Sequence, residues 1–178
     1  MSKAIGLIEF SSIAKGIEAC DVMLKSSQTE IIRAATVCPG KYIVVISGNT
    51  SDIQTAIQKG KNSALKYVVD TLIIPNAEQG LINAMQGKEK HSTNGAIGII
   101  EFYSISSAIQ AADTATKTTN VTLLEIKMGY AIGGKGVVIV TGDSSAVRQA
   151  VEAAIKGRDL LISSAVITKP SDKLWETL

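Results

Sequence analysis

The feature that most constrains this 178-residue chain is an internal repeat. Residues 4–12 recur as residues 96–104 with seven of the nine positions identical, and residues 40–49 have a second copy at 134–143. The offset grows from 92 to 94 between these matches, so the second copy carries two extra residues between them. Such a repeat predicts two copies of one structural unit, each of about 90 residues.

The repeat predicts a first domain at 1–87, a linker at 88–95 and a second domain at 96–178. The linker is expected because this stretch is strongly polar, as solvated connections are. Domains of this size bury little surface alone, and only seven residues of the chain are aromatic. We therefore expect each core to consist of small aliphatic side chains. Contacts with neighbouring subunits are expected to complete it.

Each repeat shows the order strand, helix, strand, strand, helix, strand. Apolar runs in the first repeat predict four strands, at residues 4–10, 30–37, 42–47 and 67–74. Pro75 is expected to end the last strand, because proline cannot donate a hydrogen bond to a sheet. Ser11 or Ser12 is expected to cap the first helix, and Asn49 or Ser51 the second. This order indicates an α+β fold: an antiparallel sheet with helices on one face, related to ferredoxin-like folds.

Helical spacing predicts which side chains of the helices face the core. The first helix is expected to turn four residues inward: Ile13, Ile17, Cys20 and Leu24. The second is expected to turn in Ile53, Ala56, Ile57, Gly60 and Ala64, and its copy Val147, Ala150, Val151, Ala154 and Ile155. On this pattern Cys20 is interpreted as a core residue rather than a metal ligand.

Composition and charge exclude several classes of protein. With 46% hydrophobic residues and a net charge of +2, the chain is not of the disordered kind. It lacks the concentrated basic stripe of a nucleic-acid binder, and no run of residues has the length of a membrane span. We expect neither nucleic acid nor membrane as a partner. Two cysteines make no disulfide framework, and a reducing cytoplasm is expected.

The repeated motifs resemble the bacterial microcompartment (BMC) shell domain. They are Ala-x-Gly-x-Ile-Glu at 4–9 and 96–101, Asp-x-x-x-Lys at 21–25 and 113–117, and a Gly-Asn/Asp-x-Ser helix start at 48 and 142. A closing Ile-x-x-Pro is clear only at 167–170. Four motifs in order, nearly all repeated, indicate a tandem-domain shell protein. The resemblance implies two tandem BMC domains and a homotrimer that mimics a hexagonal tile in the shell of a cytoplasmic compartment.

The resemblance also implies a metal site. The turn from Cys38 to Lys41 is similar to that of tandem shell proteins of propanediol-utilisation compartments, which hold an iron–sulfur cluster at the trimer centre. It implies a pore loop of Pro39, Gly40 and Lys41, with Gly133, Gly134 and Lys135 from the second repeat. One thiolate cannot hold a cluster, but Cys38 occurs three times in a trimer. The implied cofactor is one [4Fe–4S] cluster per trimer, ligated by Cys38 of three subunits.

The further roles implied are structural. At positions matching Lys25 and Lys117, shell domains contact the edge of an adjacent tile, so other BMC shell proteins are implied partners. Glu9 and Glu101 are expected to make structural hydrogen bonds rather than a catalytic pair. No acid, base or nucleophile constellation appears, so no enzyme activity is expected. The cluster is expected to pass electrons or a metal cofactor across the shell, with a redox partner protein possible.

Other functions stay open at the level of sequence. The tile can have a plain metabolite pore that Cys38 merely lines, without a cluster. The chain can also be a soluble oxidoreductase with Cys38 as a reactive thiol. A phosphate loop at 133–136 is disfavoured, because that motif needs Ser or Thr after its Gly-Lys, where this chain has Gly136. The simpler interpretation of residues 133–136 is a tight hairpin between two strands.

Overall fold

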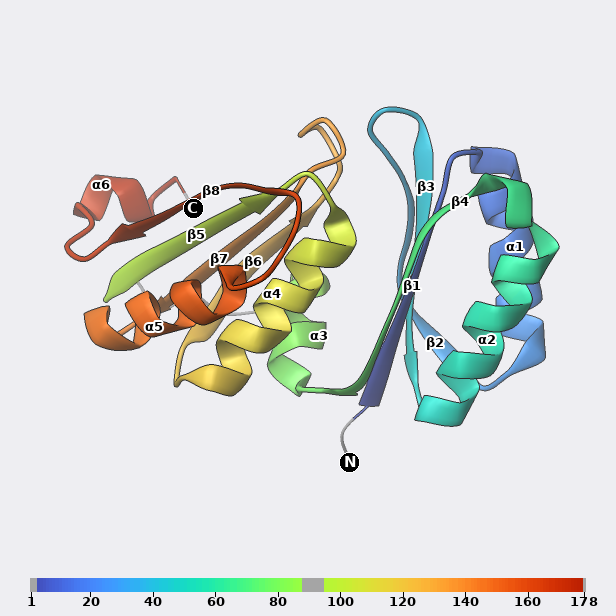
Figure 1. The fold of residues 1–178 in the computed structure, drawn as a ribbon, viewed down its shortest axis with the longest axis horizontal. Helices are drawn as coiled ribbons and strands as arrows, with labels where there is room; N and C mark the ends of the chain where they lie inside the picture. Colours follow the sequence, from blue (N-terminus) through green and yellow to red (C-terminus); the bar gives the residue numbers. More distant parts are fainter. Residues whose placement is uncertain (1–2, 88–94, 178) are drawn as a thin grey trace. The chain divides into compact units, whose positions relative to one another are not determined.

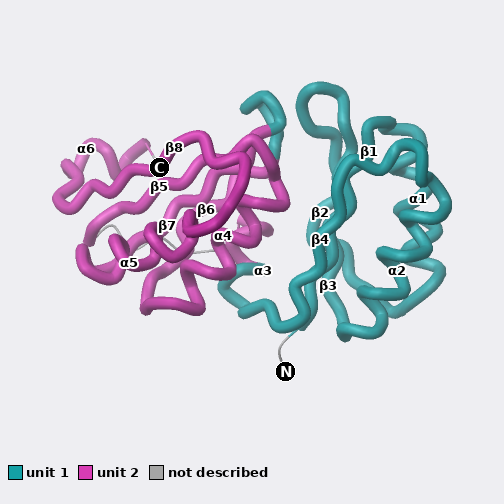
Figure 2. The backbone as a smooth tube through the Cα atoms, viewed as in Figure 1, with its two compact units in different colours: residues 1–82, 129–134 teal, residues 83–128, 135–178 magenta. Residues whose placement is uncertain are grey.

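A computed structural model describes residues 3–87 and 95–177, and Figure 1 shows its ribbon. The chain forms two compact units, Met1–Ile82 with Gly129–Gly134, and Asn83–Met128 with Lys135–Leu178 (Figure 2). Of the predicted linker at 88–95, only Gly95 is among the described residues.

The first unit has the predicted strand and helix order. Its elements are β1 (Lys3–Phe10), α1 (Ile13–Ser26), β2 (Thr29–Val37), β3 (Lys41–Gly48), α2 (Thr50–Ser63), a 3-10 turn (Leu65–Tyr67) and β4 (Val68–Ala77). The strands form one antiparallel sheet in the order β2-β3-β1-β4. Both helices lie on the same face of it (Figure 1), which confirms the α+β fold.

The second unit repeats this arrangement. Its elements are β5 (Ala96–Phe102), α4 (Ile105–Thr118), β6 (Thr122–Met128), β7 (Gly136–Gly142), α5 (Ser144–Ile155) and β8 (Leu161–Ile167), with the sheet order β6-β7-β5-β8. Two short helices, α3 (Gln79–Met85) and α6 (Asp172–Trp175), lie outside the repeated pattern and were not predicted. None of the helices in 3–87 and 95–177 is long and apolar enough to span a membrane.

The helix starts and the inner face of α2 are as predicted. Ser12 is the N-cap of α1, and its hydroxyl accepts a hydrogen bond from the Lys15 amide at 3.4 Å. Asn49 occupies the N-cap position of α2. The buried residues of the two matching helices are Ile53, Ala56, Ile57 and Gly60 in α2, and Val147, Ala150, Val151 and Ala154 in α5.

The predicted inner face of α1 is wrong except for Cys20. The residues that face the core are Gly16, Ala19, Cys20 and Met23. Ile13, Ile17 and Leu24 are instead 37%, 53% and 36% exposed. The reason is close packing: a Cβ at Gly16 would come within 2.7 Å of the Tyr42 ring, so α1 approaches the sheet on the side that carries Gly16. An apolar stripe is left on the outside of the helix.

The predicted end of the last strand is also wrong. Pro75 lies inside β4, which continues to Ala77. Because β4 is an edge strand and pairs only with β1, a residue without an N–H is tolerated there.

Candidate functional site

Cys38 lies at the tip of the β2–β3 hairpin. Its side chain is half-buried, while Pro39 and Gly40 are exposed. The chain reverses with Gly40 at φ +87°, where glycine avoids a steric penalty, and the Gly40 amide donates to the Val37 carbonyl at 3.0 Å. The hairpin therefore presents a thiol that is partly open to solvent on a backbone that is locally hydrogen-bonded.

Lys41, the last residue of this turn, points back to the sheet. Its ammonium forms an ion pair with Glu9 of β1, and the two side chains are 24% and 4% exposed. The charge of Lys41 is thus neutralised by a buried carboxylate. The pair ties the base of the turn to β1, and it gives Glu9 the structural role expected from the sequence.

The second unit has the equivalent pair. Lys135 donates to Glu101 at 2.9 Å, with side chains that are 38% and 28% exposed. This pair is more open to water than the first. It also engages the lysine of the rejected phosphate-loop interpretation.

The loop between β6 and β7 is not the tight hairpin that the sequence suggested. Five residues separate the paired Thr36 and Tyr42, whereas seven separate the equivalent Met128 and Gly136. The two extra residues of the second repeat therefore lie in this loop. Its first part, Gly129–Gly134, belongs to the first unit, where the Cys38 amide donates to the Gly129 carbonyl at 3.2 Å.

The structure thus brings some of the predicted pore-loop residues together. Gly134 lies beside the Cys38 backbone, and a Cβ added at Gly134 would lie 3.6 Å from Nζ of Lys41. Gly133 has open space around it, and Lys135 turns to Glu101 instead. Sequence reasoning missed the contact, within the first unit, between Cys38 and the loop Gly129–Gly134, since the only signal for it was the two-residue insertion.

The Asp-x-x-x-Lys motif forms one ion pair within each first helix. Lys25 Nζ lies 2.6 Å from Asp21 Oδ2 in the last turn of α1, and Lys117 Nζ lies 2.8 Å from Asp113 in α4. The lysine side chains are 75% and 38% exposed, so solvent-screened pairs of this kind stabilise the helices by about 0.3–0.5 kcal/mol. The tile-edge role of both lysines stays a prediction.

The thiol of Cys20 is unlike that of Cys38. Cys20 is 7% exposed among the apolar side chains of the first core, as predicted. Burial, with a smaller contribution from Asp21, raises the pKa of the Cys20 thiol. Within residues 3–87 and 95–177, no three His, Cys, Asp or Glu side chains gather to hold a metal ion.

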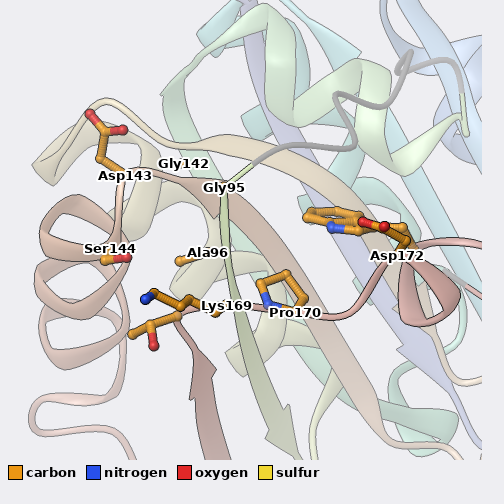
Figure 3. A pocket seen from close by; sticks show the side chains of 10 residues that line it. Gly95, Ala96, Gly142, Asp143, Ser144, Lys169, Pro170 and Asp172 are labelled. Atoms are coloured by element: carbon orange, nitrogen blue, oxygen red, sulfur yellow. The ribbon is translucent and has the colours of Figure 1, made fainter.

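A pocket of about 290 Å3 lies in the second unit at the start of α5 (Figure 3). Asp143, Ser144, Lys169, Pro170 and Asp172 are among the residues that line it. Another pocket, of about 330 Å3, lies in the first unit, where the start of β2 and the end of β3 line it with residues that include Thr29, Gly48 and Asn49. Sequence reasoning found the Gly-Asn/Asp helix starts but no pocket beside them. Charges of both signs line the second-unit pocket, which favours no single class of ligand.

Comparisons with known proteins agree with the fold and with the repeat. A profile described as "BMC domain" matches residues 4–77 and again 96–170. The chain is 39% identical to the bacterial microcompartment shell protein PduT of Citrobacter freundii, over 100% of this chain and 98% of that protein. It is 30% identical to the carboxysome assembly protein CcmO of Synechococcus elongatus, over 98% of this chain and 68% of that protein.

Solved structures show the same architecture. A crystal structure of a microcompartment protein from Desulfitobacterium hafniense DCB superposes with a TM-score of 0.95 at 42% identity, covering 99% of both chains. The fused permuted hexameric shell protein MSM0275 gives a TM-score of 0.63 at 21% identity, over 85% of this chain and 81% of that one, and so shares the fold. The chain therefore belongs to the BMC-domain family of microcompartment shell proteins and carries two BMC domains in tandem.

Proposed function

We propose that this chain forms a homotrimeric tile of a microcompartment shell, with one [4Fe–4S] cluster at its centre held by Cys38 of three chains. The tile conducts electrons, or passes a metal cofactor, across the shell, and it assembles with other BMC shell proteins. Its role is structural and conductive rather than catalytic. The observation that carries the proposal is a partly exposed thiol at the tip of a hairpin in a chain of this family.

The donor set fits a shared cluster. Iron–sulfur clusters prefer cysteine thiolates, and the only other cysteine, Cys20, is buried in the core of the first unit. A threefold axis near the hairpin tip would gather three Cys38 thiolates around one point. Three thiolates leave one iron without a protein ligand. Such a cluster supplies one-electron transfer, with a potential that depends on solvent exposure and on hydrogen bonds to sulfur.

Self-association is supported first by the two equivalent helices α1 and α4. On α1, Ile13 and Ile17 are 37% and 53% exposed. The equivalent residues on α4, Ile105 and Ile109, are fully buried. Since the same apolar face is covered in one repeat and open in the other, the open face of α1 suits another protein surface.

A second asymmetry concerns the sheet faces that carry no helices. In the first unit Leu7 is fully buried and Leu72 is 6% exposed on this face. Their equivalents in the second unit, Ile99 and Ala165, are partly buried and exposed. Each chain thus offers one open helix face on the first unit and one partly open sheet face on the second, where Leu174 and Trp175 pack against the cluster that contains Ile99. Two different surfaces that mate head to tail generate a ring when the rotation between subunits closes, and the closed ring that we propose is a homotrimer.

Purification without oxygen tests the cluster. The native protein is expected to be brown, with absorbance near 400 nm, and Cys38→Ser is expected to lose the colour while remaining a trimer. Cys20→Ala is the matched control and is expected to keep the colour, because the side chain of Cys20 is buried in the core. A colourless, iron-free native trimer would contradict the cluster and indicate a plain metabolite pore. Colour retained in Cys38→Ser would contradict the ligand assignment.

A further inference from the structure

One backbone carbonyl connects the two hairpin loops of the first unit. The Gly129 carbonyl accepts a hydrogen bond from the Cys38 amide at 3.2 Å and another from the Gly134 amide at 3.3 Å. The loop from the second repeat is thereby closed on itself and attached to the residue that carries the thiol. The amide of a hairpin-tip residue, which would otherwise face water, gains a fixed acceptor.

Gly134 also packs against the carbonyl group of Cys38. A Cβ at position 134 would overlap the carbonyl oxygen of Cys38 and lie 3.3 Å from its carbonyl carbon. Gly134 has φ +80°, a conformation that also favours glycine. The loop therefore contacts both the N–H and the C=O of Cys38, and a side chain at 134 is excluded on two grounds.

The shape of this loop is demanding. Gly129, Ala131, Gly133 and Gly134 all have positive φ, at 75°, 59°, 69° and 80°. Ala131 is not a glycine, and a left-handed conformation costs such a residue about 1–2 kcal/mol. A backbone of this kind persists only where its surroundings fix it. Here the contact with Cys38 is one of the interactions that do so.

We propose that Gly129–Gly134 of the second repeat is a positioning segment for Cys38. It holds the Cys38 main chain from both sides, so that the thiol of each chain points in one direction. A shared cluster needs such precision, because its ligands must be held to within about 0.5 Å. The inference rests on the proposed function for the purpose of the positioning, whereas the positioning itself can be measured in the protein without iron.

Two neighbouring glycines provide the test. Gly134→Ala and Gly133→Ala both force alanine into a left-handed conformation, but only Gly134→Ala overlaps the Cys38 carbonyl, since position 133 has open space. In iron-free trimer, hydrogen exchange at the Cys38 amide is expected to rise about tenfold or more in Gly134→Ala. Iodoacetamide is expected to alkylate Cys38 faster in this variant. Gly133→Ala is expected to match the native protein in both measurements.

Equal effects of the two substitutions, or none from Gly134→Ala, would overturn the inference. If Gly134→Ala does not fold, the native protein still decides: its Cys38 amide should exchange as slowly as sheet amides, and rapid exchange would overturn the inference. Iron content separates this inference from the proposed function. An iron-free native trimer with the expected exchange pattern refutes the cluster and supports the positioning. A native cluster retained in Gly134→Ala, with unchanged exchange, refutes the positioning alone.

Discussion

Lys41 and Glu9 form an ion pair that joins the cysteine hairpin to β1, one of the two inner strands of the first sheet. Only 4% of the Glu9 side chain is exposed, so the carboxylate depends on Lys41 for compensation of its charge. The equivalent carboxylate of Glu101 is 28% exposed and can be solvated in part by water. The same pair of residue types is therefore expected to contribute differently in the two repeats.

Lys41→Met should destabilise the protein more than Lys135→Met. The first substitution leaves a buried, unpaired carboxylate and is expected to lower the free energy of unfolding by about 3 kcal/mol. The second leaves the carboxylate of Glu101, which water can solvate in part, and is expected to lower the free energy of unfolding by about 1 kcal/mol or less. Urea unfolding of the iron-free protein measures both, and equal losses would contradict the assigned difference in burial.

Ile17→Asp should break the trimer. Ile17 is 53% exposed on the outer face of α1, and a carboxylate there would be buried without a partner in a head-to-tail interface. Mass measurement in solution is expected to give monomers for this variant. Leu65→Asp is the control, since Leu65 is 61% exposed and lies outside the stripe. A trimer that survives Ile17→Asp would refute the use of this face.

Charge reversal at Lys25 and Lys117 should prevent assembly with other tiles and leave the trimer intact. Both lysines also pair with an aspartate on their own helix, so that loss must be separated from loss of an edge contact. Asp21→Asn removes the pair in α1 and keeps Lys25, and it is expected to assemble normally. Electron microscopy of the sheets formed by each variant is the measurement. Normal sheets from the double charge reversal would rule out the tile-edge role.

The two cysteines should react at different rates. The pKa of Cys20 is raised above its ordinary value of 9.0 by burial, so its thiol stays protonated, and unreactive, to higher pH than a free thiol. In native iron-free protein at pH 8, iodoacetamide is expected to label Cys38 first, and both cysteines only after denaturation. Mass analysis of peptides distinguishes them. Faster labelling of Cys20 would contradict the burial assigned to it.

Repetition made most of the fold predictable. Two copies of the same strand and helix pattern constrain each other, and the element order, the Ser12 cap and the inner face of α2 follow from local sequence. Apolar spacing failed on α1 because it counts large side chains, whereas the packing against Tyr42 selects small ones. Ile13 and Ile17, which helical spacing assigned to the core, instead lie on a surface that the proposed trimer would cover.

The site was predictable only as a set of residues. Cys38 stands out because it is a lone cysteine next to Pro39 and Gly40 in a turn, but no local rule relates it to a loop some ninety residues later. The hydrogen bond from Cys38 to Gly129 depends on tertiary structure, and so does the direction of Lys41. The sequence shows the two-residue insertion in the second repeat, but it does not show that the lengthened loop contacts Cys38.

Native mass spectrometry of anaerobically purified protein tests the central claim most directly. The account predicts a trimer that carries one [4Fe–4S] cluster, so that four irons and four sulfides are shared by three chains. Cys38→Ser should give a trimer of protein mass alone. A cluster on each separate chain, or a native trimer without iron, would contradict the account.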